Sequence, residues 1–283
     1  MNSVLHWLRR QRQHLLGPTR EVPETLWQTN LSHYPFLIAL TLQEQAILRH
    51  LSTHFLSEKE FHGANGQQVT DAAALAVATQ ACLPLVHWSR GEKAPSRPHT
   101  LDWYDDFVGI ILYPGAIRAR RHYRDATGLV HEYSETIAGE AMQQGPVVLS
   151  WPDVQQASDT VAAGHNLVIH EFVHKLDMCD GQADGVPPLP RGFLGTRDPR
   201  TARRTWLAHL QVAFDRFREQ INLAERFGGP PVWLNTYGTQ SLTEFFAVTC
   251  EAYFVNRDRF TEDFGDLVLL FDAFFKHRSA LMA

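Results

Sequence analysis

Two histidines and a glutamate near the middle of the chain have the spacing found in metal-dependent hydrolases. The segment His170-Glu171-Phe172-Val173-His174 reads H-E-x-x-H. On an α-helix, residues four apart lie on one face, so both imidazoles can bind the same zinc ion. Glu171 lies beside His170 and can reach a water molecule bound to that zinc, so we expect it to act as a general base. The alternative is an ordinary amphipathic helix with two surface histidines.

The residues around this motif favour a helix with one apolar side. Apolar residues recur at three- and four-residue spacing beside the polar positions, namely Ile169, Phe172, Val173 and Leu176. Asp180-Gly181 then provides a stop signal. Asp177 lies seven residues after His170 and therefore on its face of the helix. It could orient a ligand histidine or the segment around Lys175, or it could simply be solvated at the helix end.

A zinc site of this kind needs a third protein ligand, and the downstream sequence offers two glutamates. Glu244 and Glu251 lie seven residues apart in a predicted helix, so both face the same way. Ser241-Leu-Thr-Glu244 is also a capping-box pattern, so Glu244 could only cap its helix. Glu251 competes with it, as a ligand or as an acceptor for a histidine N–H. His165 is set aside because it lies nearly a turn and a half from His170.

Composition and charge restrict the environment and the partners. The net charge of −5 gives no electrostatic basis for binding nucleic acid or an anionic membrane. No apolar run approaches the roughly 20 residues that a membrane span needs. At the N-terminus the charges follow the apolar residues, which is the wrong order for a secretory signal. We therefore expect a cytoplasmic protein with neither nucleic acid nor membrane as a direct partner.

The cysteines point to the same compartment. Cys82, Cys179 and Cys250 are few, widely spaced and odd in number, which is typical of free thiols in a reducing environment. Cys179 follows the motif helix and Cys250 lies on the glutamate-bearing helix, so either could bind a metal. Burial as a small apolar residue is the favoured interpretation of both.

The elements that must position these side chains follow from periodicity and from start and stop signals. Helices are predicted at 2–16, from the Thr41 capping box onward, from Thr70 or Asp71 to Cys82, at 201–227, at 241–254 and across Phe260 to Phe275. Strands are predicted at 107–113, 129–136 and 146–151, and together they imply a small sheet ahead of the motif helix. The loop at 181–200 is rich in Pro and Gly, and such a loop usually lines a site or packs as a lid.

The chain is long for one hydrophobic core but not too long. With 283 residues, 44% of them apolar and 20% charged, it is an ordinary globular sequence. The predicted fold class is α+β, with a small mixed sheet, an active-site helix and mainly helical terminal parts. A mainly helical N-terminal part at 1–100, ending in a candidate linker at 91–100, is expected to pack on a core at 101–283 as one compact unit.

Three segments resemble the Mlc titration factor A family of bacterial zinc peptidases. They are Gln144–Trp151, His170–Asp177 and Thr236–Val248. The resemblance implies a zincin-like metallopeptidase core, similar to the catalytic domain of anthrax lethal factor, and Zn²⁺ as the cofactor. It also implies that Glu244 is the third zinc ligand and that Tyr237 is an electrophilic partner. Without the resemblance, Tyr237 reads as a buried core tyrosine.

The predicted function is hydrolysis of peptide bonds in a peptide or protein substrate, and the resemblance implies aminopeptidase-like activity. His170, His174 and Glu244 would bind Zn²⁺. Glu171 would take a proton from the zinc-bound water and pass it to the leaving amine. The phenol of Tyr237 would stabilise the tetrahedral intermediate.

Two further expectations accompany this reading. By analogy with zinc peptidases, strand 146–151 would be an edge strand that holds extended substrate through main-chain hydrogen bonds.

The alternative function is a regulatory binding protein, because the family is named for sequestering a glucose-linked transcriptional repressor. The peptidase site would then be latent. A purely structural zinc site is disfavoured, since it would have no use for a general base at Glu171.

Overall fold

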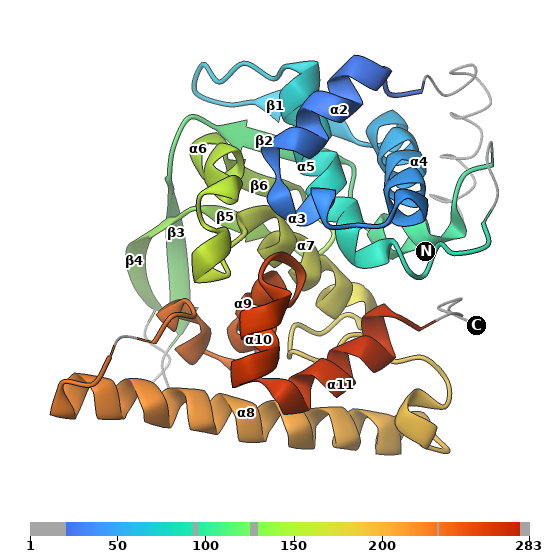
Figure 1. The fold of residues 1–283 in the computed structure, drawn as a ribbon. Helices are drawn as coiled ribbons and strands as arrows, with labels where there is room; N and C mark the ends of the chain where they lie inside the picture. The colour runs from blue at the N-terminus through green and yellow to red at the C-terminus, as the bar shows by residue number, and fades with distance from the viewer. Residues whose placement is uncertain (1–20, 93–95, 125–129, 231, 278–283) are drawn as a thin grey trace.

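Helices lie on both sides of a small mixed sheet, which makes the fold α+β (Figure 1). The structure is a computed structural model, and its described residues are 21–92, 96–124, 130–230 and 232–277. The helix predicted at 2–16 lies outside these residues. The N-terminal helices are α2 (Glu24–His33), α3 (Pro35–Ile38), α4 (Leu42–Glu58) and, after the first strand, α5 (Asp71–Cys82).

The helices that follow the last strand are α6 (Trp151–Gln155), α7 (Leu167–Asp177), α8 (Pro199–Phe227), α9 (Leu242–Val255), α10 (Arg257–Asp263) and α11 (Gly265–Phe275). Of these, α7 and α9 carry the candidate site residues. Short 3₁₀ turns connect the elements: η1 (Leu83–Leu85), η2 (His99–Tyr104), η3 (Gln156–Ser158), η4 (Val161–Ala163), η5 (Met178–Asp180), η6 (Phe193–Gly195) and η7 (Thr236–Thr239). In Figure 1, α7 and α9 lie in the middle, between the N-terminal helices above and α8 below.

The main sheet has four strands in the order β1 (Glu60–Gly63), β2 (Gly109–Tyr113), β6 (Val147–Ser150) and β5 (Gly139–Ala141). β1, β2 and β6 are parallel, and β5 pairs with β6 in the antiparallel sense. The strand predicted at 146–151 is therefore confirmed, but its expected edge position is wrong, because β2 and β5 flank it. All four residues of β6 are buried, as is typical of a strand covered on both faces.

A second, separate pair of strands departs from the predicted sheet. β3 (Ile117–Arg124) and β4 (Val130–Ile137) form a two-stranded antiparallel ribbon. The strand predicted at 129–136 corresponds to β4, so its existence is confirmed. Its membership of one sheet with the strands at 107–113 and 146–151 is wrong, because β4 pairs with β3.

The helix boundaries follow the capping signals. Thr41 makes the full capping box with Glu44 at the start of α4, and Thr70 caps α5 by accepting from the Ala73 N–H. One helix was expected across Phe260 to Phe275, but the chain forms α10 and α11 instead. The backbone leaves the helical region at Phe264, where φ is −129° and ψ is 41°. The two short helices can thereby turn their phenylalanines into one core.

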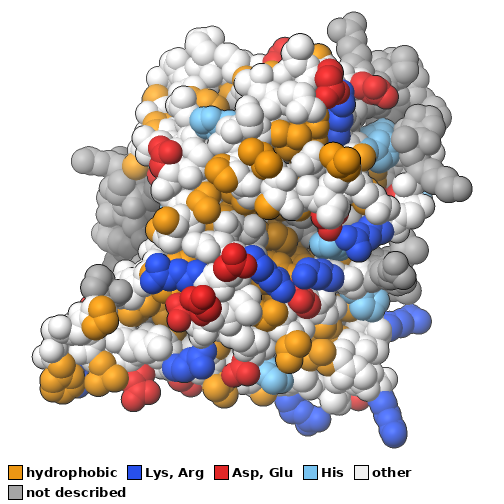
Figure 2. Space-filling view, in the orientation of Figure 1, with side chains coloured by type: hydrophobic (Ala, Val, Ile, Leu, Met, Phe, Trp, Pro, Cys, Tyr) orange, Lys and Arg blue, Asp and Glu red, His pale blue; other side chains and the backbone are white. Residues whose placement is uncertain are grey.

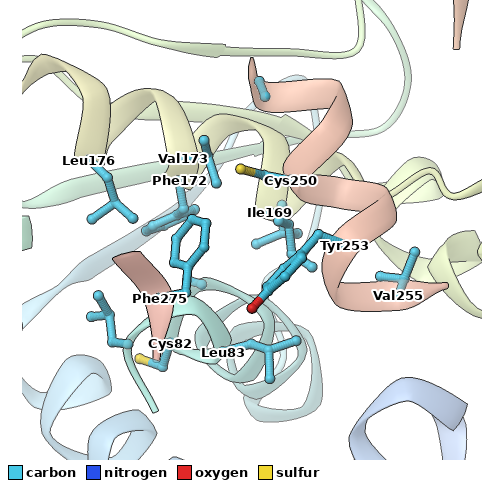
Figure 3. Close-up of a cluster of buried hydrophobic side chains, with 14 of the residues drawn as sticks. Cys82, Leu83, Ile169, Phe172, Val173, Leu176, Cys250, Tyr253, Val255 and Phe275 are labelled. Carbon is cyan, nitrogen blue, oxygen red and sulfur yellow. The ribbon is translucent and has the colours of Figure 1, made fainter. Parts of the chain in front are cut away.

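The core surrounds the apolar side of α7. Figure 3 shows Ile169, Phe172, Val173 and Leu176 packed against α5, α9 and α11. Phe172 is fully buried, and its ring contacts those of Phe55, Tyr104 and Phe107. Burial of one such aromatic side chain contributes about 2–3 kcal/mol, so this packing fixes α7 against both the N-terminal and C-terminal helices. Among the described residues, no helix is both long and apolar enough to cross a membrane.

Candidate metal centre

Two helix starts bring the candidate residues together. Asn166 caps α7 by accepting a 2.9 Å hydrogen bond from the Ile169 N–H, so the helix begins at Leu167. Ser241 caps α9 by accepting from the Glu244 N–H at 3.1 Å. Helix α9 packs along α7, and its first turn faces the H-E-x-x-H segment. The predicted motif helix is thus confirmed.

Three side-chain atoms converge where these helices meet. The Nε2 atoms of His170 and His174 are 3.1 Å apart. Glu244 Oε2 lies 3.1 Å from the His170 Nε2 and 3.3 Å from the His174 Nε2. These residues form a group that could hold a metal ion. The Glu244 carboxylate points at the two imidazoles and does not reach back to Ser241, so the capping-box alternative is wrong for its side chain.

Glu251 lies behind His170. It is fully buried, and its Oε1 is 2.7 Å from the His170 Nδ1. Its Oε2 accepts from the Asn166 N–H at 2.5 Å and lies 2.7 Å from the His165 Nδ1. Of the two roles considered for Glu251, the geometry matches that of an acceptor for a histidine N–H. His165, which is not a member of the three-residue group, completes this buried cluster from the surface side.

The carboxylates determine the charge of the centre. Burial alone would lower the pKa of His170, but hydrogen bonds to Glu244 and Glu251 outweigh it and raise that pKa well above its ordinary value. Burial likewise opposes ionisation of both glutamates. Hydrogen bonds from His170 and His174 nevertheless lower the pKa of Glu244, and those from His165 and His170 lower the pKa of Glu251. Both carboxylates are therefore ionised at neutral pH.

Glu171 has a different environment from the other two glutamates. It is buried within α7, and burial raises its pKa above the ordinary value for glutamate. A raised pKa makes a carboxylate a stronger base, which favours the role of a general base. The charges of His170, His174 and Glu244 also act on the pKa of Glu171, so its carboxyl lies near the converging ligand atoms.

Tyr237 lies beside the centre on η7. Its ring centroid is 6.1 Å from that of His170, and the side chain is only partly buried. The alternative of a buried core tyrosine is therefore wrong. The Asn235 side chain accepts from the Tyr237 N–H at 3.0 Å and fixes the turn that carries the ring.

Asp177 holds the loop that follows α7. Its Oδ2 accepts from the Gly185 N–H at 2.8 Å, and the Trp206 indole donates to the Gly185 carbonyl at 2.7 Å. Thr243, next to Glu244, donates to the Ala183 carbonyl at 3.1 Å. This loop therefore packs against the start of α9. Asp177 is fully buried, which excludes solvation at the helix end, and burial raises its pKa to about 7.

Lys175 is a second buried charge on α7. Its ammonium group donates to Asp106 Oδ2 at 2.7 Å, to the Gly145 carbonyl at 3.0 Å and to the Met142 carbonyl. Burial lowers the pKa of Lys175. The partner of Lys175 is thus Asp106 and not Asp177, and its bonds fix the turn between β5 and β6.

The three cysteines are free thiols and lie outside the three-residue group. Cys82 and Cys250 are buried, and Cys179 is partly buried. Burial raises the pKa of the Cys179 thiol to about 12, so it is protonated at neutral pH.

Sequence reasoning missed Gly139 on β5. A Cβ atom placed on this glycine would lie 2.6 Å from Glu171 Oε1, so the β5 backbone lies against the Glu171 side chain. A glycine leaves no signal in a hydrophobic pattern.

Comparison with known proteins assigns the class of protein to which this fold and site belong. A family model described as glucose-regulated metallo-peptidase M90 matches residues 5–276. The chain belongs to this metallopeptidase family, and membership implies a metal ion.

Named relatives agree with this assignment over most of the chain. Mlc titration factor A of Salmonella arizonae is 31% identical over 253 residues, which cover 89% of this chain and 90% of the relative. Mlc titration factor A of Escherichia coli O1:K1 / APEC is 32% identical over 252 residues, which cover 88% and 85% respectively. The resemblance seen in the sequence is therefore confirmed.

Proposed function

We propose that this protein is a zinc-dependent peptidase with a zincin-like centre, in which His170, His174 and Glu244 hold the metal. The observation that carries the proposal is the triangle of donor atoms, with edges of 3.1, 3.1 and 3.3 Å. Zinc bonds of 2.0–2.1 Å in a tetrahedron imply edges of about 3.3 Å, so the triangle fits one face of a zinc site. Two imidazoles and one carboxylate leave a fourth position open, as catalytic sites require.

Zinc bound at this face would act as a Lewis acid, lowering the pKa of water and polarising a peptide carbonyl. Glu171 accepts the proton of the attacking water and returns it to the leaving amine nitrogen. Tyr237 donates a hydrogen bond to the oxyanion that forms at the carbonyl oxygen. Glu251 accepts from the His170 Nδ1–H, fixing the tautomer that leaves Nε2 free for the metal.

The substrate is a peptide, and aminopeptidase-like activity is part of the proposal. The family assignment and the buried carboxyl of Glu171 support it. The free state of the three cysteines supports a cytoplasmic location.

A second function is proposed because the relatives are named as Mlc titration factors: the chain binds a transcriptional repressor of the Mlc type.

The test uses three proteins: wild type, Glu171→Gln and His174→Ala. Each is assayed for bound zinc and for hydrolysis of aminoacyl-nitroanilides and an internally quenched peptide. We expect wild type to bind one zinc and cleave substrate, Glu171→Gln to keep zinc and lose activity by at least about 1,000-fold, and His174→Ala to lose both. Glu219→Gln, on the exposed side of α8, is the matched control.

The outcomes separate the two functions. Zinc binding without cleavage of any substrate would reject the peptidase proposal. Complex formation between purified Mlc and the inactive Glu171→Gln variant, measured by calorimetry, would then support the binding function. Absence of both zinc binding and complex formation would reject both proposals.

A further inference from the structure

Strand β5 passes directly over the polar side of α7 and touches Glu171. A Cβ atom placed on Gly139 would lie 2.6 Å from Glu171 Oε1, 2.9 Å from Glu171 Cγ and 2.9 Å from Leu167 Cδ1. These distances are well inside van der Waals contact, so a larger residue fits only if Glu171 moves. Gly139 is not among the residues with positive φ, so backbone conformation does not require glycine here. Glycine is required at this position because the β5 backbone lies so close to Glu171 and Leu167.

The strand is held in this position from its other end as well. Leu167, Glu171 and Lys175 follow one another at four-residue spacing on one side of α7. Gly139 lies over the first two, and the Lys175 ammonium group holds the carbonyls of the β5–β6 turn. The antiparallel pairing of Gly139 with Leu149 ties β5 to the rest of the sheet. Gly139 therefore cannot lift away from Glu171 without breaking several bonds.

Packing against β5 restricts the orientation of the Glu171 side chain. The side chain is buried, and among the described residues its carboxylate has no hydrogen-bond partner. A glutamate has three rotatable side-chain bonds and several staggered conformers. The β5 backbone at Gly139 closes one side of the space in which those conformers could lie.

We propose that Gly139 is a positioning residue for Glu171. Its missing side chain lets β5 close onto the carboxylate and hold it beside the ligand atoms of α7. The catalytic meaning of this contact rests on the peptidase function proposed above. A misplacement of about 1 Å in a reacting group can cost about 100-fold in rate, so a single methyl group at this position is enough to matter.

The first test compares Gly139→Ala with Gly109→Ala. Both glycines are in strands of the same sheet, but a Cβ on Gly109 would make only an ordinary 3.5 Å contact with Pro146. We expect Gly139→Ala to keep one bound zinc, because the three ligands are untouched. Its kcat should fall at least about 10-fold with KM within about 2-fold of wild type. Gly109→Ala should stay within about 2-fold in both constants.

The second test does not depend on activity. It compares the thermal unfolding of wild type, Gly139→Ala, Glu171→Ala and the double variant, all in chelator. Gly139→Ala should lower Tm by about 3 °C or more in the wild-type background. With Glu171→Ala, the Cγ and Oε1 contacts disappear, so the same substitution should lower Tm by less than half as much. If Gly139→Ala alone does not fold, recovery of folding in the double variant supports the same contact.

Equal losses of Tm in the two backgrounds would overturn the proposal, and so would a Gly139→Ala enzyme with wild-type kcat. If the wild-type protein cleaves no peptide, the proposed function fails. The thermal cycle still decides whether Gly139 positions Glu171, so the two failures are distinguishable.

Discussion

Helices α7 and α8 differ in how far their charged side chains are buried. In α7, ten of eleven residues are buried, and five of its positions carry ionisable side chains. In α8, only six of 29 residues are buried, and its charged residues face solvent. Figure 2 shows Lys, Arg, Asp and Glu side chains gathered over the part of the surface where α8 lies. An apolar stripe and a cap suffice for α8, whereas α7 needs a specific partner for nearly every polar group.

Removal of a charged side chain should therefore lower the free energy of unfolding far more in α7 than in α8. Burying an ionised group is costly unless it is paired and hydrogen-bonded, and removing one partner leaves that cost uncompensated. Exposed pairs contribute little because water and salt screen them. The four predictions below test this contrast, starting with the largest expected effect.

Lys175→Met should reduce the free energy of unfolding by about 3–5 kcal/mol, because it removes the ammonium group that donates to Asp106 and to the Met142 and Gly145 carbonyls. Arg203→Met, which removes an α8 ion pair to Asp184, should cost less than about 1 kcal/mol. Urea unfolding of both variants measures the difference. Equal losses would show that the contrast between the helices is wrong.

Asp177 should make stability depend on pH. Its pKa is about 7 in the folded state and 3.8 for the ordinary group. Between these values the folded state binds more protons than the unfolded chain, so the free energy of unfolding falls as pH rises. Across this window wild type should lose up to about 3 kcal/mol relative to Asp177→Asn, with both proteins metal-free. Parallel pH profiles for the two proteins would contradict the assignment.

Glu251→Gln should weaken the proposed zinc binding by about 10- to 100-fold, because the amide still accepts from His170 but no longer supplies a negative charge. Competition with a chromophoric chelator measures the affinity. The exposed α8 variant Glu219→Gln should bind zinc as wild type does. An unchanged affinity in Glu251→Gln would remove Glu251 from the metal centre.

Phe227→Ser should change the free energy of unfolding by no more than about 0.5 kcal/mol, although it removes a large aromatic ring. Phe227 is 79% exposed at the end of α8, so folding removes little of its surface from water. The same substitution at Phe172 in α7, which is fully buried, should prevent folding or cost several kcal/mol. Urea unfolding again gives the comparison.

Helices with strong caps and long apolar stripes could be predicted from the sequence. Thr41, Thr70 and the H-E-x-x-H helix are examples, since their signals are local. β5 could not be predicted, because three residues carry no alternation of apolar and polar positions. The analogy with zinc peptidases places the strand at 146–151 at the sheet edge, whereas its unbroken apolar run indicates an interior strand.

The candidate site shows the same division. His170, Glu171 and His174 follow from spacing within one helix. The choice between Glu244 and Glu251 as the candidate ligand depends on which carboxylate lies at Nε2 of His170 and which lies at Nδ1. These are distances between elements far apart in the sequence. Sequence spacing could show only that both face the same way. The Gly139 contact is the extreme case, since a residue without a side chain leaves no pattern to read.

The bond between Trp88 and the last described helix has a consequence for biosynthesis. The indole Nε1 donates to the Phe274 carbonyl at 2.8 Å, across 186 positions of sequence. Trp88 also packs on Trp103, Phe274 and Phe275. While the ribosome is still translating α8 and α9, the part of this tryptophan that Phe274 and Phe275 cover has no partner. The nascent chain therefore keeps an exposed apolar surface until α11 has left the ribosome.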